Sequence, residues 1–151
     1  MGDPVTWYDE FLFRVEIDDV VSAAFTTCSE LKKTAGKTSH RQGGVRIPIK
    51  EAGLIEVADI TLTRGACSDH DLYTWFQRVY DAKTGKGTVP ATYKRSFDIV
   101  QYDLAGTEVE RHTVLGAFPI DFTAGKWDNN QDGTKRMESI TLSCDDWDLV
   151  D

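Results

Sequence analysis

Residues 60–85, with the sequence ITLTRGACSDHDLYTWFQRVYDAKTG, contain the clearest secondary-structure signals in the chain. Residues 60–63 alternate between apolar side chains and threonines, which predicts a half-buried strand. Ser68 followed by Asp71 forms a capping box at a helix start. Apolar side chains then recur at i, i+3, i+4 and i+7 of a helix, at Leu72, Trp75, Phe76 and Val79. The sequence therefore predicts one helix over residues 69–83, laid across a β domain.

The composition is that of an ordinary soluble globular protein. The chain has 151 residues, of which 40% are apolar and 28% charged, so one domain over residues 1–151 is expected. No apolar run approaches the roughly 20 residues that a membrane helix needs. The formal charge of −8 argues against a basic face that grips nucleic acid. Three cysteines are too few for a disulfide scaffold, although pairing between subunits stays open for Cys28, Cys67 and Cys144.

Alternating segments on both sides of the helix predict further strands. Residues 11–17 and 20–31 are expected to form a first hairpin, and residues 93–104 and 108–115 a second. A last strand is expected over residues 137–144.

Proline cannot donate to a strand ladder, so Pro119 is expected to break the pairing after the second hairpin. Six or seven strands with one helix fit a closed or nearly closed antiparallel barrel, or a sandwich of two sheets.

The segment KKTAGKTSHRQGG, residues 32–44, differs in kind from the rest of the chain. It is basic and glycine-rich, and it has no hydrophobic period, so an exposed loop is expected. Loops of this length within a compact domain usually have a function.

Patterns typical of catalytic or metal sites are incomplete. Residues 35–38 match the end of a phosphate-binding loop, but Leu31 stands where a glycine is required. Residues 128–133 match the first half of a calcium loop, but Ser139 stands where a bidentate glutamate is required. Histidines and cysteines have no ligand spacing, and there is no GxSxG motif. We expect no catalytic residue, cofactor or metal.

Taken in order, several short motifs resemble a known family. They are FLFRVEI, AFTTCSEL, RQGG, ITLTRG, LYTWF, LAGTEVERHTV, AFP and ESITLS, and they span nearly the whole chain. This order is similar to that of the tail tube proteins of contractile phages and the inner tube proteins of contractile injection systems. The segments 30–31, 52–53, 128–135 and 144–147 depart from the family pattern.

The resemblance implies a two-sheet β-barrel with one flanking helix. Six copies form a ring whose axial strands join into one inner barrel, and the rings stack into a tube. The loop of residues 32–50 reaches into the neighbouring ring, and the helix of residues 69–83 lies on the outer wall, towards a sheath. Inter-ring contacts are expected at Lys32, Lys33, Lys37, Arg41 and Arg46. Small polar side chains that suit a wet lumen are Ser22, Thr26, Asp59, Thr61 and Thr63. The sheath-facing helix residues are Asp69, Asp71, Tyr73, Gln77 and Arg78.

The function implied is that of a structural, non-enzymatic virion protein that conducts genomic DNA during ejection. Its expected partners are itself, a tail sheath protein, a tape measure protein in the lumen, and baseplate and tail terminator proteins. DNA passes transiently, and no membrane binding is expected. The location is the virion tail, after assembly in the host cytoplasm. Three alternatives are an injection-system tube that delivers protein effectors, a monomeric β-barrel binding module that contacts its ligand through residues 32–44, and a small enzyme.

Overall fold

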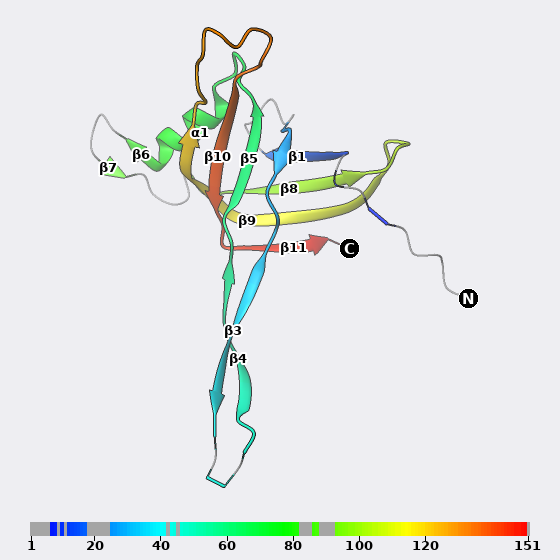
Figure 1. The fold of residues 1–151 in the computed structure, drawn as a ribbon, viewed down its shortest axis with the longest axis vertical. Coiled ribbons are helices and arrows are strands. Elements are labelled where there is room, and N and C mark those ends of the chain that lie inside the picture. Colours follow the sequence, from blue (N-terminus) through cyan, green and yellow to red (C-terminus); the bar gives the residue numbers. More distant parts are fainter. Residues whose placement is uncertain are drawn as a thin grey trace.

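The computed structural model describes residues 7–8, 10, 12–17, 25–41, 43–44, 46–81, 86–87 and 93–150 (Figure 1). Its body is built from seven antiparallel strands, hydrogen-bonded in the order β1-β8-β9-β10-β5-β2 with β11 also on β9. Their bounds are β1 Phe13–Ile17, β2 Thr27–Cys28, β5 Ile60–Gly65, β8 Arg95–Tyr102, β9 Glu108–Thr123, β10 Met137–Ser143 and β11 Asp146–Val150. Two further hairpins are β3 Lys33–His40 with β4 Ile49–Val57, and β6 Tyr80–Asp81 with β7 Lys86–Gly87.

The long strand β9 divides the body into two sheets. Up to Ala117 it pairs with β8, and from Phe118 onward it pairs with β10. Strands β8, β11 and the first part of β9 run across the direction of β5 and β10 (Figure 1). The prediction that the pairing of the second hairpin breaks near Pro119 is confirmed, since β8 pairs with β9 no further than Ala117. The strand continues to Thr123, and Pro119 lies opposite Leu142 beside a bulge, where the ladder is already irregular.

The two-sheet antiparallel fold with one helix is confirmed, but a closed barrel is not. Among the described residues, the path ends at β1 on one side and at β2 on the other. The predicted first hairpin is also wrong for its described part, because β1 pairs with β8 whereas β2 pairs with β5. Residues 18–24 lie outside the described chain. The second hairpin is confirmed as β8 and β9.

The core lies between the two sheets and under the helix. Alternation on β1, β5 and β10 sends every second side chain inward. Each fully buried aliphatic or aromatic side chain contributes about 1.5–3 kcal/mol. The buried apolar residues in this cluster are Val15, Ile17, Phe25, Ile60, Leu62, Leu72, Trp75, Phe97, Val114, Ala117, Ile140 and Leu142.

The helix α1, Asp71–Val79, is shorter than the predicted range of residues 69–83. Residue 80 already begins β6, which pairs with β7. At the start, the amide of Asp71 donates to Asp69 Oδ1 at 3.3 Å, so Asp69 takes the acceptor role that the sequence assigned to Ser68. The buried Trp75 donates through Nε1 to the carbonyl of Tyr93 at 2.6 Å. Within the described chain, α1 is too short and too polar to cross a bilayer.

Candidate assembly surfaces

The most conspicuous surface is a hairpin that projects from the body, here called the arm (residues 32–57). It consists of β3, β4 and their connection, and it extends far from the sheets at one end of the molecule (Figure 1). The sequence predicted an exposed loop over residues 32–44. The exposure is confirmed, since every residue of β3 is exposed, but residues 33–40 form a strand. The phosphate-loop pattern at residues 35–38 lies within this strand and does not precede a helix.

The two strands of the arm approach most closely at a pair of glycines. A Cβ built on Gly53 would lie 3.2 Å from the carbonyl carbon of Gly36, whereas one on Gly36 meets ordinary contacts of 3.4 Å or more. The register also shifts here, between Ala35 and Lys37. A side chain at position 53 would therefore require the backbone of the opposite strand to shift by a few tenths of an ångström.

Large apolar side chains on the arm face solvent. Leu54 is 87% exposed and Ile55 67% exposed, and Ile47 near the tip is 78% exposed. An isolated two-stranded hairpin is marginally stable in water, and grouped apolar exposure of this kind marks an interaction surface.

The base of the arm is fixed to the body by one lysine. Lys33 Nζ lies 2.9 Å from Asp146 Oδ1 and 3.5 Å from Asp148 Oδ1, and 4.7 Å from the centre of the Trp147 ring. The hydrogen bond to Asp146 raises the pKa of Lys33, and the same bond lowers the pKa of Asp146. Lys33 therefore contacts β11 of its own chain. The other proposed inter-ring residues, Lys32, Lys37, Arg41 and Arg46, are all exposed along the arm.

The sheet of β2, β5, β10 and the end of β9 carries hydroxyl side chains on its outer face. Thr61 lies opposite Thr141, with their hydroxyl oxygens 3.2 Å apart, and Thr63 lies opposite Ser139. Thr26 donates through its hydroxyl to the carbonyl of Thr63 at 3.0 Å. The structure thus brings together three of the residues proposed to face a lumen. Asp59 is exposed in the link between β4 and β5, and Ser22 lies outside the described chain.

The helix residues proposed to face a sheath are only partly exposed, and some of them contact other side chains of the same chain. Tyr73 is 49% exposed, and its ring lies 5.8 Å from that of Phe122 on β9. Its hydroxyl accepts a hydrogen bond from Gln77 Nε2 at 2.8 Å. Asp69 and Asp71 are half-buried at the helix start, whereas Arg78 is exposed in the last turn. A hydrogen bond with Asp71 is the main factor that raises the pKa of Asp69.

Sequence reasoning missed a buried ion pair beside the helix start. Arg64 is 1% exposed, and it donates through Nε to Glu138 Oε1 at 2.7 Å and through a terminal nitrogen to the carbonyl of Asp69 at 3.1 Å. It thereby ties β5, β10 and the start of α1 together. The alternation of the strand could have shown that Arg64 is buried, because residues 60, 62 and 64 point to the same, inward face.

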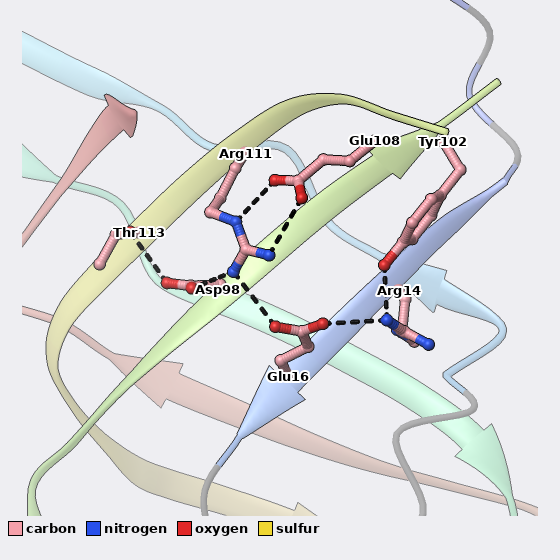
Figure 2. A network of polar contacts seen from close by, with 7 residues as sticks. All are labelled: Arg14, Glu16, Asp98, Tyr102, Glu108, Arg111 and Thr113. Atoms are coloured by element: carbon pink, nitrogen blue, oxygen red, sulfur yellow. Dashed lines mark hydrogen bonds and ion pairs between the residues drawn. The ribbon is translucent and has the colours of Figure 1, made fainter. Parts of the chain in front are cut away.

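A second missed feature is a polar network on the outer face of β1, β8 and β9 (Figure 2). Arg111 binds Glu108 at 2.7 Å, Asp98, and Glu16 at 3.1 Å, and these three carboxylates raise its pKa. In register, Val100 lies between Arg111 on one side and Arg14 on the other. Val100 is fully buried on a polar face because long arginine stems cover it.

The calcium-loop pattern at residues 128–133 forms a turn. Asp128 Oδ1 accepts the amide of Asn130 at 3.0 Å, which is an Asx turn, and the Asp128 carbonyl accepts the amide of Gln131. Within the described chain there is no cluster of three or more His, Cys, Asp or Glu residues placed to hold a metal.

The open pair of crossed antiparallel sheets, the single helix and the projecting arm define a tail-tube-like protein. Solved structures support this fold. The chain is similar to one in the extended-state sheath/tube terminator of PVC, an extracellular contractile injection system, with 21% identity, a TM-score of 0.79 and coverage of 99% of each chain. It is also similar to a chain of the anti-feeding prophage baseplate, with 20% identity, a TM-score of 0.74 and coverage of 99% of this chain and 97% of the other. Hcp1 from Flavobacterium johnsoniae matches at 8% identity and a TM-score of 0.53, over 92% of this chain and 94% of that one.

The sequence itself gives the family. The model of the T4-like virus tail tube protein gp19 matches residues 9–148, and the chain belongs to this family of structural tail tube proteins. No curated protein matches the chain.

Proposed function

We propose that six copies of this tail tube protein form a ring, and that the rings stack through the arm into a tube that conducts genomic DNA during ejection. The observation that carries the proposal is the arm itself. A hairpin with Leu54 87% exposed and Ile55 67% exposed is marginal alone, so a neighbouring subunit that covers it stabilises both partners.

The open sheet supplies the edges for ring closure. Among the described strands, β2 pairs only with β5, and the end of β9 pairs only with β10. Unpaired strand edges associate readily, and a rotation that closes the contact gives a ring. Joining β2 of one subunit to the end of β9 in the next would place the hydroxyl face around the axis. Hydroxyl side chains without cations offer phosphates no ion pairs, which suits DNA passage without binding.

Charge supports the stacking contact. Residues 32–57 contain six basic and two acidic side chains, a formal charge of +4, so the remaining chain carries −12. Opposite signs guide the arm of one ring to the body of the next. We assign this role to Lys32, Lys37, Arg41 and Arg46, while Lys33 fixes the direction of the arm through Asp146.

The remaining partners follow from the tube role. A sheath protein contacts the helix side of the ring, a tape measure protein occupies the lumen before ejection, and baseplate and terminator proteins bind the two ends. The protein is structural, without catalysis or membrane binding, and it belongs to the virion tail after assembly in the host cytoplasm.

A second candidate is the inner tube of an injection system that delivers protein effectors. It is favoured by the structural similarity to chains of PVC and anti-feeding prophage particles. Particles purified from the producing cell distinguish the two: attached DNA-filled heads support the phage tail, and headless particles with protein cargo support the injection system.

Electron microscopy of the purified chain over a range of concentrations tests the assembly. We expect rings with an open centre that stack into tubes. Lys37→Glu should raise the concentration needed for tubes, whereas Arg78→Glu, with the same charge change on the helix, should not. A wild-type chain that forms no rings or tubes, even when nucleated by baseplate proteins, contradicts the proposal.

The glycine pair of the arm provides a second test. Gly53→Ala requires the opposite strand to shift slightly, whereas Gly36→Ala adds the same methyl group with ordinary contacts. We expect Gly53→Ala to impair tube formation more strongly than Gly36→Ala, with both monomers equally folded by circular dichroism. Equal assembly of the two variants would show that the close approach has no role in stacking.

A further inference from the structure

The connection between β9 and β10, residues 124–136, is a loop that exposes a tryptophan. Trp127 is 72% exposed, and the Arg136 guanidinium lies over its ring at 4.6 Å. The Asx turn at Asp128 fixes the middle of the connection. Gly125 has a φ of +103°, and the carbonyl of Met137 fills the place of a Cβ there. The loop therefore holds Trp127 in a defined position towards solvent.

A groove runs along this loop. It has a volume of about 570 Å³, and its lining includes Trp127, Arg136 and Met137. Met137 is itself 38% exposed, so the groove offers an aromatic ring and a thioether to an apolar side chain. Apart from the Arg136 contact, most of the Trp127 surface is left open by the described residues.

The groove and the arm lie at opposite ends of the molecule. Along the longest axis, the β9–β10 loop marks one end and the tip of the arm the other (Figure 1). The arm therefore does not reach the groove of its own chain. A contact between two different surfaces at opposite ends is heterologous, and its repetition gives a linear stack.

We propose that the groove at Trp127 receives the arm of the next copy in the stack, with Leu54 of that arm against the tryptophan ring. This deepens the proposed function and rests on it. The arm exposes aliphatic side chains, and the groove offers a partly uncovered aromatic ring, so their contact removes apolar surface from water on both sides.

Charges of both signs lie at this end, since Lys126, Lys135 and Arg136 line the groove together with Asp128. Asp128 and Asp132 are exposed on the loop, and Asp69 and Asp71 are half-buried at the nearby helix start. The two segments are neighbours, because the amide of Ala66 donates to the carbonyl of Arg136 at 2.8 Å. Carboxylates and cations therefore nearly balance at this end, and the contact proposed here rests on its apolar side chains.

Another apolar groove lies at the tip of the β8–β9 hairpin and is lined by Trp7, Leu12, Leu104 and Val109 among others. This tip extends to the side of the long axis and not to its end (Figure 1). An arm bound there would direct the next copy sideways, which does not extend a tube. This groove is the competing site in the test.

The experiment compares tube assembly by the full-length wild type, Trp127→Ala and Trp7→Ala. Trp7 is 87% exposed, so both variants lose the same kind of side chain from a solvated position. Truncation of an aromatic anchor at an interface weakens binding by about tenfold or more. We expect Trp127→Ala to raise the critical concentration for tubes about tenfold without loss of single rings, and Trp7→Ala to leave it unchanged.

A photo-reactive benzophenone side chain in place of Leu54 identifies the contact directly. Tubes are assembled from this variant and irradiated. Mass spectrometry should then find cross-links to residues 124–137 of another copy. Cross-links to residues 101–109 or 7–12, or normal tubes from Trp127→Ala, would overturn the assignment while the tube function stands. Failure of the wild type to form rings or tubes would instead contradict the proposed function.

Discussion

Replacing Glu138 with methionine removes the partner of a buried arginine and leaves the volume of the site nearly unchanged. Arg64 is 1% exposed, and its Nε lies 2.7 Å from Glu138 Oε1. Breaking a buried pair from one side costs about 3–5 kcal/mol, because the remaining charge loses its counter-ion without regaining water. A domain of this size has a free energy of unfolding of about 5–15 kcal/mol, so the loss is a large fraction of it. The expected fall in melting temperature is roughly 6–20 °C.

Urea denaturation, followed by tryptophan fluorescence at concentrations where the chain is monomeric, measures this loss. Low concentration matters because self-association stabilises the folded state by mass action. The double variant Arg64→Met/Glu138→Met should recover much of the loss, since an apolar pair replaces an unpaired charge. Glu108→Met is the matched control, since Glu108 accepts from Arg111 Nε at the same 2.7 Å but at an exposed site where Asp98 and Glu16 remain. If Glu138→Met lowers the free energy of unfolding by no more than Glu108→Met does, burial does not set the energy of the ion pair, and the reasoning is refuted.

Two further predictions concern single side chains. Lys33 lowers the pKa of Asp146, so this pair stabilises the fold above the unfolded-state pKa of Asp146 and loses its effect as the pH falls through the lower folded-state value. The stability difference between wild type and Lys33→Met should therefore shrink from pH 7 to pH 3 in urea titrations; a constant difference would contradict the ion pair. Burial raises the pKa of Cys28 to about 11, so iodoacetamide at pH 8 should modify the exposed Cys67 first, as read by peptide mass spectrometry. Equal rates would contradict the burial of Cys28.

The parts of the fold that follow from local hydrophobic patterns were predictable. Strand β5 and helix α1 bury one face each, so their apolar side chains recur with periods of 2 and 3.6. The end of the helix was not predictable in the same way. Residues 80–81 pair with residues 86–87, and this backbone pairing leaves no mark in the hydrophobic pattern.

The arm could be recognised as exposed but not as a hairpin. Its strands bury neither face in a core, so the alternation that identifies a strand is missing, and backbone pairing alone defines the structure. Pro119 shows the converse case. A residue that forbids one hydrogen bond was expected to break the pairing of the hairpin, and β9 does change partners at this point, beside an irregular ladder.

The surfaces divide between those that sequence chemistry indicates and those that depend on register. The residue types of Thr61 and Thr63 suggested a small polar face, and pairing with Thr141 and Ser139 extends it across neighbouring strands. The network around Arg111 needs three strands in one register before its carboxylates converge, so no spacing in the sequence predicts it.

The position of the arm relative to the body gives its charged side chains a separate role. Carboxylates of the body bind nearby cations, with three of them on Arg111 and two on Lys33 at the base of the arm. The exposed bases of the arm instead lie on a hairpin that projects from the body (Figure 1). In the proposed stack, an arm that projects from the body brings its exposed side chains to another copy, and the heterologous position of the arm makes that copy the next one along the axis. Lys33, at the start of β3, binds Asp146 and Asp148 of β11, so its proposed role is to fix the direction of the arm and not to contact the next ring.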